Sequence, residues 1–174
     1  MLYASTEIAN WFLVKFSKEH SDVTPMKLMK LVYLTHGWYY YLSGGKPLIS
    51  EDVQAWEFGP VFPELYHRTK RYGSGFVTDC IETYNSEKKT TEYITVSKSN
   101  EQLIKLLERI WEVYSEVPNE NLNGYIRGKD SAWQLTWDEM KEIGMTQSRI
   151  DPERIIEQFR KFSIIGEINN ILNT

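Results

Sequence analysis

QAWEFGPVFPELYHRTKRYG, residues 54–73, is the stretch that decides how this chain folds. It gathers aromatic residues around Gly59-Pro60, adds a second proline at Pro63, and ends in the basic run His67–Arg71. Gly59 can adopt a backbone conformation that is closed to other residues, and Pro60 fixes the φ angle that follows. Pro63 suits the first turn of a helix. The stretch therefore predicts a rigid corner between a strand and a helix, filled by aromatic side chains.

Two short segments near this corner have the pattern of β-strands. Residues 52–58 alternate between two faces, and residues 91–97 are a second short candidate. The polar run NSEKKTT, which lies between them, indicates an exposed turn. We expect the two segments to pair as a small antiparallel sheet.

Helical signals dominate the rest of the chain. Thr24 suits the N-cap of a helix and Pro25 its first position, while Gly44-Gly45 supplies the left-handed conformation that ends helices. Apolar periodicity or capping residues predict further helices that begin near Thr6, Pro63, Asn100, Leu122, Ser131 and Pro152. The sequence therefore predicts a helix-dominated α+β fold, a compact bundle of about five to seven helices with one small antiparallel strand pair.

Composition excludes several classes of protein. The chain has 174 residues, 41% hydrophobic and 25% charged, which suits one globular domain rather than a disordered chain. Its formal net charge of -4 gives no overall attraction to nucleic acid or to anionic membranes. Cys80 is the single cysteine, so neither an intrachain disulfide nor a cysteine-based metal site can form. Without a signal-peptide pattern or a membrane-spanning apolar run, we expect a cytoplasmic protein.

The histidines give little support for catalysis. None of His20, His36 and His67 has a partner at metal-ligand spacing, and no nucleophile elbow, phosphate loop or GxGxxG motif is present. We interpret His36 as a hydrogen-bonded packing residue. An enzyme that uses His67 with Glu64 or Glu57 is the alternative. The sequence predicts no catalytic, cofactor-binding or metal-binding residues and no cofactor.

The basic run could serve a partner or the fold. Arg68 and Arg71 lie among aromatic residues, as in a nucleic-acid site, but they also fall in the last turn of a short helix that ends at Gly73. Cations at that place stabilise the helix dipole, so nucleic-acid binding is disfavoured. Both arginines remain candidates for contact with a protein partner.

Other candidate contacts are aromatic or aliphatic. Tyr40 and Tyr41 lie on the flank of the second helix and could be interface anchors or core residues. Residues 163–174, SIIGEINNILNT, form an amphipathic tail. Its isoleucines, which include Ile168 and Ile171, repeat at helical spacing and so share one face. The tail could pack on its own domain, lie in a groove of a partner, or pair two copies of the chain.

A longer stretch that includes the corner resembles a known family. MKLMKLVYLTHGWYYYLSGGKPLISEDVQAWEFGPVFPELYHRTKRYG, together with the later SAWQLTW, resembles the Panacea domain, the antitoxin domain of bacterial and prophage toxin–antitoxin systems. The residues that carry the resemblance are Leu28, Leu31, Gly37, Trp38, Trp56, Gly59, Pro60, Tyr66 and Trp133. Ala132 stands where the family often has proline, and Arg127 where it often has histidine.

The resemblance implies a single domain over residues 1–162. The tail 163–174 lies beyond it, and we expect the tail to pack on the same domain. It implies an antitoxin that neutralises a cognate protein toxin by direct binding, without catalysis. A phage, prophage or host interaction factor that shares the fold without a neighbouring toxin is the alternative. That alternative includes a proteolytic adaptor, whose further partner is a cytoplasmic protease. Homo-oligomerisation is left open.

Overall fold

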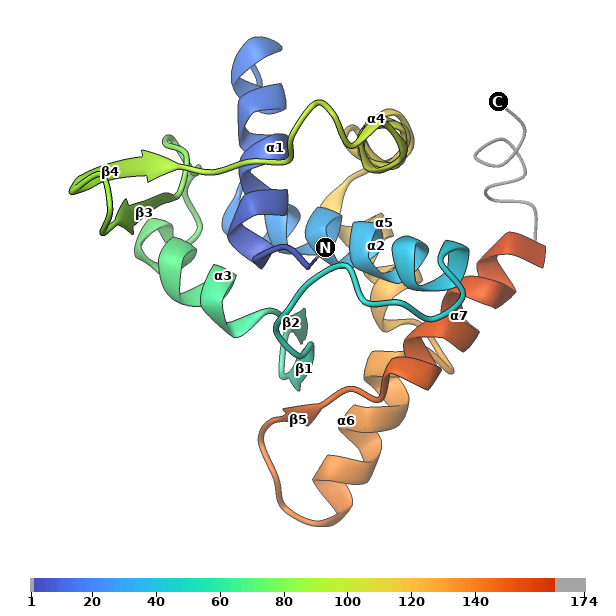
Figure 1. Ribbon diagram of the computed structural model, residues 1–174. Coiled ribbons are helices and arrows are strands. Elements are labelled where there is room, and N and C mark those ends of the chain that lie inside the picture. The colour runs from blue at the N-terminus through green and yellow to red at the C-terminus, as the bar shows by residue number, and fades with distance from the viewer. Residues whose placement is uncertain (1, 165–174) are drawn as a thin grey trace.

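Seven α-helices dominate the computed structural model, which describes residues 2–164 of the chain (Figure 1). The helices are α1 (Ser5–Lys18), α2 (Pro25–Leu42), α3 (Pro63–Thr69), α4 (Glu101–Tyr114), α5 (Asn119–Arg127), α6 (Ala132–Glu142) and α7 (Pro152–Ile164). A 3-10 turn, η1 (Lys70–Tyr72), follows α3 directly. With the short strands described below, these elements confirm the predicted helix-dominated α+β fold.

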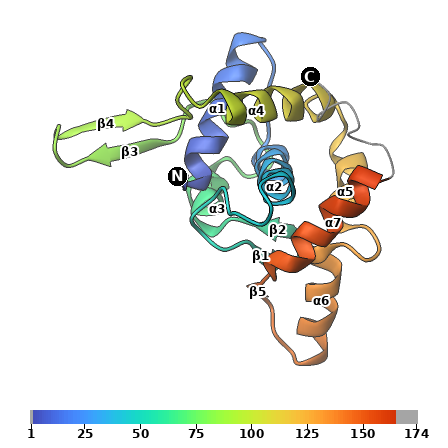
Figure 2. The same ribbon diagram turned by 45° about the vertical axis from the view of Figure 1, so that its right-hand side comes forward.

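Helix α2 is the centre of the molecule. Figure 2 looks almost along its axis and shows the other elements arranged around it. Helices α1, α3, α4, α5 and α7 all pack against α2, and 13 of its 18 residues are buried. Because neighbours cover α2 on nearly every side, its burial extends well beyond the single apolar stripe of a typical surface helix.

The ends of α2 follow the predicted signals. The hydroxyl of Thr24 accepts a hydrogen bond from the backbone N–H of Lys27 at 3.3 Å, and proline opens the helix. Gly44 and Gly45 have φ angles of 69° and 94° just after the helix ends. Near its middle, a Cβ atom at Gly37 would lie 2.0 Å from Cε2 of Phe159. Glycine at this position therefore lets α7 cross close to α2.

The strands form two separate sheets rather than one pair. Strands β1 (Gln54–Trp56), β2 (Gly59–Val61) and β5 (Ser148–Arg149) form an antiparallel sheet in the order β2-β1-β5. Strands β3 (Glu82–Asn85) and β4 (Thr90–Tyr93) form a second antiparallel sheet. The predicted pairing of residues 52–58 with 91–97 is wrong. Each segment instead pairs with the strand that a tight turn joins to it, because closing a short loop costs less conformational entropy.

Candidate functional site

The hairpin formed by β1 and β2 is the centre of the candidate site. Trp56 pairs with Gly59 across a turn that contains only Glu57 and Phe58. Gly59 has a φ angle of 132°, which L side chains rarely adopt. Strand β2 lies at the edge of its sheet, where Pro60 is tolerated, and α3 begins at Pro63 as predicted. The predicted strand-to-helix corner is therefore a complete hairpin followed directly by α3.

Side chains from α5 and α6 hold the turn of this hairpin. The indole Nε1 of Trp133 donates a hydrogen bond to the carbonyl oxygen of Trp56 at 2.8 Å. The guanidinium group of Arg127 lies 4.4 Å from the centre of the Trp133 ring. Its nitrogens also donate to the carbonyl oxygens of Glu57 and Phe58 at 3.4 and 3.5 Å. Arg127, which was noted above as a departure from the family pattern, therefore contacts both the hairpin turn and Trp133.

An open cleft of about 460 Å³ lies beside the hairpin. Helix α2, the hairpin, α3, η1, α5 and residues 146–147 all contribute to its lining; we call it the hairpin cleft. The side chains of Met29 and Val61 in its lining are buried, whereas Met26 and Phe58 are 48% and 67% exposed. Tyr66, another lining residue, packs edge-to-face on Trp56 with ring centres 4.9 Å apart. The cleft therefore presents apolar and aromatic surface to solvent.

Two buried lysines, Lys27 and Lys30, lie on α2, and Lys30 lines the cleft. The ammonium group of Lys30 donates to the carbonyl oxygen of Asn119 at 2.9 Å, and that of Lys27 donates to the carbonyl oxygen of Val117. Burial lowers the pKa of both lysines, and that of Lys30 falls to about 8. The positive charges of Lys27 and Arg127 lower the pKa of Lys30 further, whereas Glu120 opposes the shift. The two lysines therefore tie α2 to Val117, between α4 and α5, and to Asn119, the first residue of α5.

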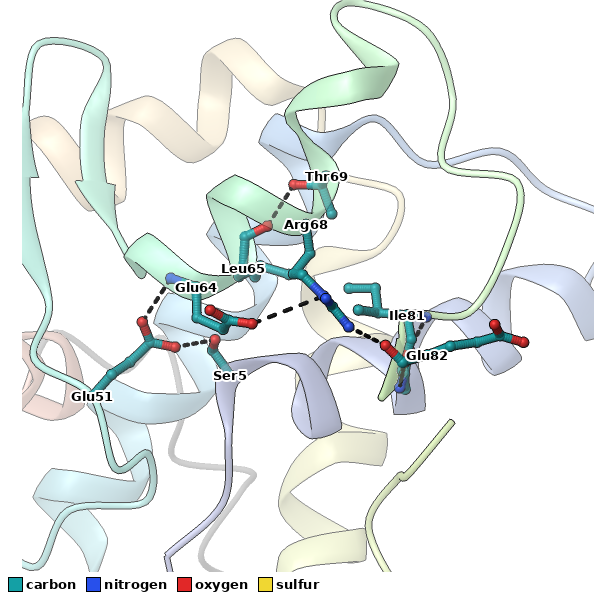
Figure 3. Close-up of polar contacts among 9 residues, drawn as sticks. Ser5, Glu51, Glu64, Leu65, Arg68, Thr69, Ile81 and Glu82 are labelled. Atoms are coloured by element: carbon teal, nitrogen blue, oxygen red, sulfur yellow. Dashed lines mark hydrogen bonds and ion pairs between the residues drawn. The ribbon is translucent and has the colours of Figure 1, made fainter. Parts of the chain in front are cut away.

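The basic run lies where the sequence predicted, in the last turn of α3 and in η1, before Gly73. Figure 3 shows Arg68 reaching two acceptors: an ion pair to Glu64 at 3.8 Å and a hydrogen bond to the carbonyl oxygen of Glu82. The start of α3 is fixed by Glu51, whose carboxylate accepts the Glu64 backbone N–H at 2.9 Å and the Ser5 hydroxyl (Figure 3). Arg68 therefore contributes to the fold whether or not it also contacts a partner.

Arg71 is also engaged within the chain. Its guanidinium group stacks 4.8 Å from the ring centre of Tyr72 and donates to the hydroxyl of the same residue at 2.8 Å. Neither this residue nor Arg68 lines the hairpin cleft. Both face a separate hollow between α3 and the β3–β4 sheet, which His67, Tyr84 and Tyr93 also line.

The histidines occupy different environments. His36 is 2% exposed, its Nδ1 accepts the backbone N–H of Ile49 at 3.3 Å, and burial lowers its pKa to about 3. It is the hydrogen-bonded packing residue that we expected. His67 is exposed, and no hydrogen bond or ion pair within residues 2–164 joins it to Glu57 or Glu64. In the same part of the chain, no group of three or more His, Cys, Asp or Glu residues is placed to hold a metal ion.

The remaining predicted contact residues are placed as follows. Tyr40 is buried and packs edge-to-face on His36, with ring centres 4.5 Å apart. Tyr41 is half-buried, and its hydroxyl accepts a hydrogen bond from Ser163 at 3.0 Å. The tail residues Ile168 and Ile171 lie outside the described residues. Of the helices within residues 2–164, none is both long and apolar enough to cross a membrane.

Most of the cleft is formed by a segment that matches a known family. Residues 28–134 match the family described as "Antitoxin SocA-like, Panacea domain". The match covers more than half of the chain, which therefore belongs to the Panacea-domain family of antitoxin-like proteins.

A curated relative supports the same family assignment. The chain is 31% identical over 70 residues to Antitoxin SocA of Caulobacter vibrioides (strain NA1000 / CB15N). The aligned part covers 40% of this chain and 37% of that relative, so it spans well under half of either protein. No solved structure matches the chain.

Proposed function

We propose that this protein is a cytoplasmic antitoxin that neutralises a protein toxin by binding it directly, without catalysis. The observation that carries the proposal is the position of the hairpin cleft: the hairpin, α3 and α5, which supply most of its lining, fall inside the matched segment 28–134. Exposed methionine, aromatic and arginine side chains are enriched at protein–protein interfaces. Met26, Phe58 and Tyr66, which are exposed, and Arg127, which is half-buried, provide such a set around one opening. The name of the relative, an antitoxin, supports the same function.

The test is co-expression with the protein encoded beside it in its own genome. We expect the neighbouring protein alone to stop growth of a bacterial host, and co-expression to restore growth. We also expect a stable complex of the two proteins on size-exclusion chromatography.

Two results would count against the proposal. Rescue without any complex would contradict neutralisation by direct binding. A neighbour that is harmless when expressed alone would favour the alternative, an interaction factor without an adjacent toxin.

A further inference from the structure

The apolar lining of the hairpin cleft indicates what kind of group it can hold. Met29 and Ile126, from α2 and α5, are 8% and 1% exposed, so they form a packed apolar part of the lining. Phe58 in the hairpin turn and Met26 at the start of α2 are 67% and 48% exposed. Burying such side chains against an apolar partner group is favourable, and methionine adapts to the shape of its partner. The cleft therefore suits a bulky apolar side chain.

The charges around the cleft have the opposite sign to the chain as a whole. Lys30, Lys70 and Arg127 line the cleft with Glu57 as the single carboxylate, although the formal net charge of the chain is -4. Eight ion pairs occur within residues 2–164, and none of them includes these three cations. Among the described residues, the three cations of the cleft therefore have no ion-paired carboxylate.

The side chain of Arg127 is held in place, but its guanidinium group makes only weak hydrogen bonds. Its guanidinium carbon lies over the Trp133 ring, 4.4 Å from the ring centre, while its hydrogen bonds to the two turn carbonyls are long, at 3.4 and 3.5 Å. A carboxylate would give shorter, charge-assisted hydrogen bonds to the same group. Because the aromatic stack already restricts the side chain, less conformational entropy is lost when a carboxylate binds.

We propose that the hairpin cleft holds an exposed segment of the partner protein in which a bulky apolar residue lies next to an aspartate or glutamate. The apolar side chain packs against Phe58, Met26 and Met29, and the carboxylate pairs with Arg127 and Lys70. This inference rests on the proposed function, because the partner is the toxin. It adds the chemistry by which that toxin is recognised.

The test uses the full chain and two sets of short synthetic peptides, capped at both ends. In the first set, Leu, Phe or Trp precedes Asp or Glu; in the second, Asn or Gln replaces the acid. Binding is measured by fluorescence anisotropy. We expect the acidic set to bind about tenfold more tightly or better, as a charge-assisted hydrogen bond predicts.

Substitutions at exposed positions then locate the binding site. We expect Phe58→Ser to weaken binding of both peptide sets by about tenfold, and Lys70→Glu to weaken only the acidic set, by about threefold to tenfold. Phe76→Ser and Lys46→Glu are matched controls, because both residues are exposed and lie outside the cleft lining. The controls should bind both sets like the wild type.

Several outcomes would overturn the inference. These are equal affinity for the acidic and amide sets, unchanged binding by Phe58→Ser, and no saturable binding of any peptide. Competition by a single-stranded oligonucleotide would assign the cleft to nucleic acid instead. Toxin neutralisation separates this inference from the proposed function. If Phe58→Ser and Lys70→Glu lose peptide binding but still neutralise the toxin, the cleft inference fails and the antitoxin function stands. If the wild type binds peptides but neutralises nothing, the antitoxin function fails.

Discussion

The two β-hairpins of this protein have opposite surroundings. All three residues of β2 are buried, and β1 has β5 on its other side. The β3–β4 hairpin instead projects from the body as a ribbon (Figures 1 and 2), with Tyr84 64% exposed and Tyr93 51% exposed. The β1–β2 hairpin is therefore part of the core, whereas the β3–β4 hairpin is surrounded mainly by solvent.

Because their surroundings differ, the two hairpins are held in place by different contacts. A two-stranded hairpin alone is marginally stable in water, so each needs support from elsewhere. The β1–β2 hairpin receives it from Trp133, Arg127 and β5, along its strands and at its turn. The β3–β4 hairpin receives it at its root and within its own turn, where Asn85 accepts the backbone N–H groups of Glu87 and Lys88 at 3.1 Å. We therefore expect substitutions in the two hairpins to differ in cost.

The largest effect is expected from Trp133→Ala. This side chain is 3% exposed and donates to the Trp56 carbonyl, so its removal leaves a cavity and an unpaired acceptor in the β1–β2 hairpin. The free energy of unfolding should fall by about 3–5 kcal/mol, measured by urea denaturation. Tyr84→Ala in the exposed ribbon is the matched control, with an expected change of about 0.5 kcal/mol or less. Equal losses would contradict the contrast between the hairpins.

A smaller effect is expected from Gly59→Ala. With a φ angle of 132°, an alanine at this position is strained whatever the space around it, and the cost should be about 1–3 kcal/mol. The control variant should change the free energy of unfolding in the opposite direction. Gly124 lies inside α5, and a Cβ atom there would meet no other atom within 4 Å, so Gly124→Ala should stabilise by up to about 1 kcal/mol. Urea denaturation measures both, and a neutral Gly59→Ala would show that the turn tolerates a side chain.

Acid should weaken the core that supports the β1–β2 hairpin. Burial holds the pKa of His36 at about 3, below its ordinary value of 6.5, so the unfolded chain binds the extra proton first as the pH falls. Stability should therefore decline between about pH 6.5 and pH 3, by up to about 1.4 kcal/mol per pH unit. Urea denaturation across this range measures the slope. His36→Gln, which does not titrate, should have a flatter slope, and an identical slope would contradict the assignment.

Sequence reasoning was most successful where the signals are local. Thr24 and Ser131 cap their helices as predicted, Ser131 through a 3.1 Å hydrogen bond from the Gln134 backbone N–H, and Pro25 opens α2. It failed on the pairing of strands, which is not local. Residues 82–85 were missed because both faces of the ribbon are exposed, so their pattern carries no apolar alternation.

The candidate site was only partly predictable. Trp56, Gly59, Tyr66 and Trp133 were expected as signature residues of the fold, but the cleft joins elements that are far apart in the sequence. Lys30 was missed because lysine is usually a surface residue. Its spacing from Lys27 within KLMKL, an otherwise apolar run at the start of α2, is the signal that could have identified it.

The smallest effect is expected when most of the β3–β4 hairpin is removed. Asn10, buried in α1, donates to the carbonyl oxygens of Ile81 and Ile94 at 2.9 and 2.8 Å, and accepts the Ile81 backbone N–H at 2.7 Å. This single side chain holds the two ends of the hairpin together at its root. The ends are close enough for a short linker to replace residues 83–92.

We expect replacement of residues 83–92 by two glycines to change the free energy of unfolding by less than about 1 kcal/mol, because the ribbon buries little apolar surface and a shorter loop costs less to close. Asn10→Ala is the control. It leaves the backbone groups of Ile81 and Ile94 without their partner, so it should cost about 1–3 kcal/mol. Urea denaturation compares the two. A loss on removing the ribbon that exceeds the loss in Asn10→Ala would mean that the ribbon supports the core, and the two hairpins would then differ only in exposure.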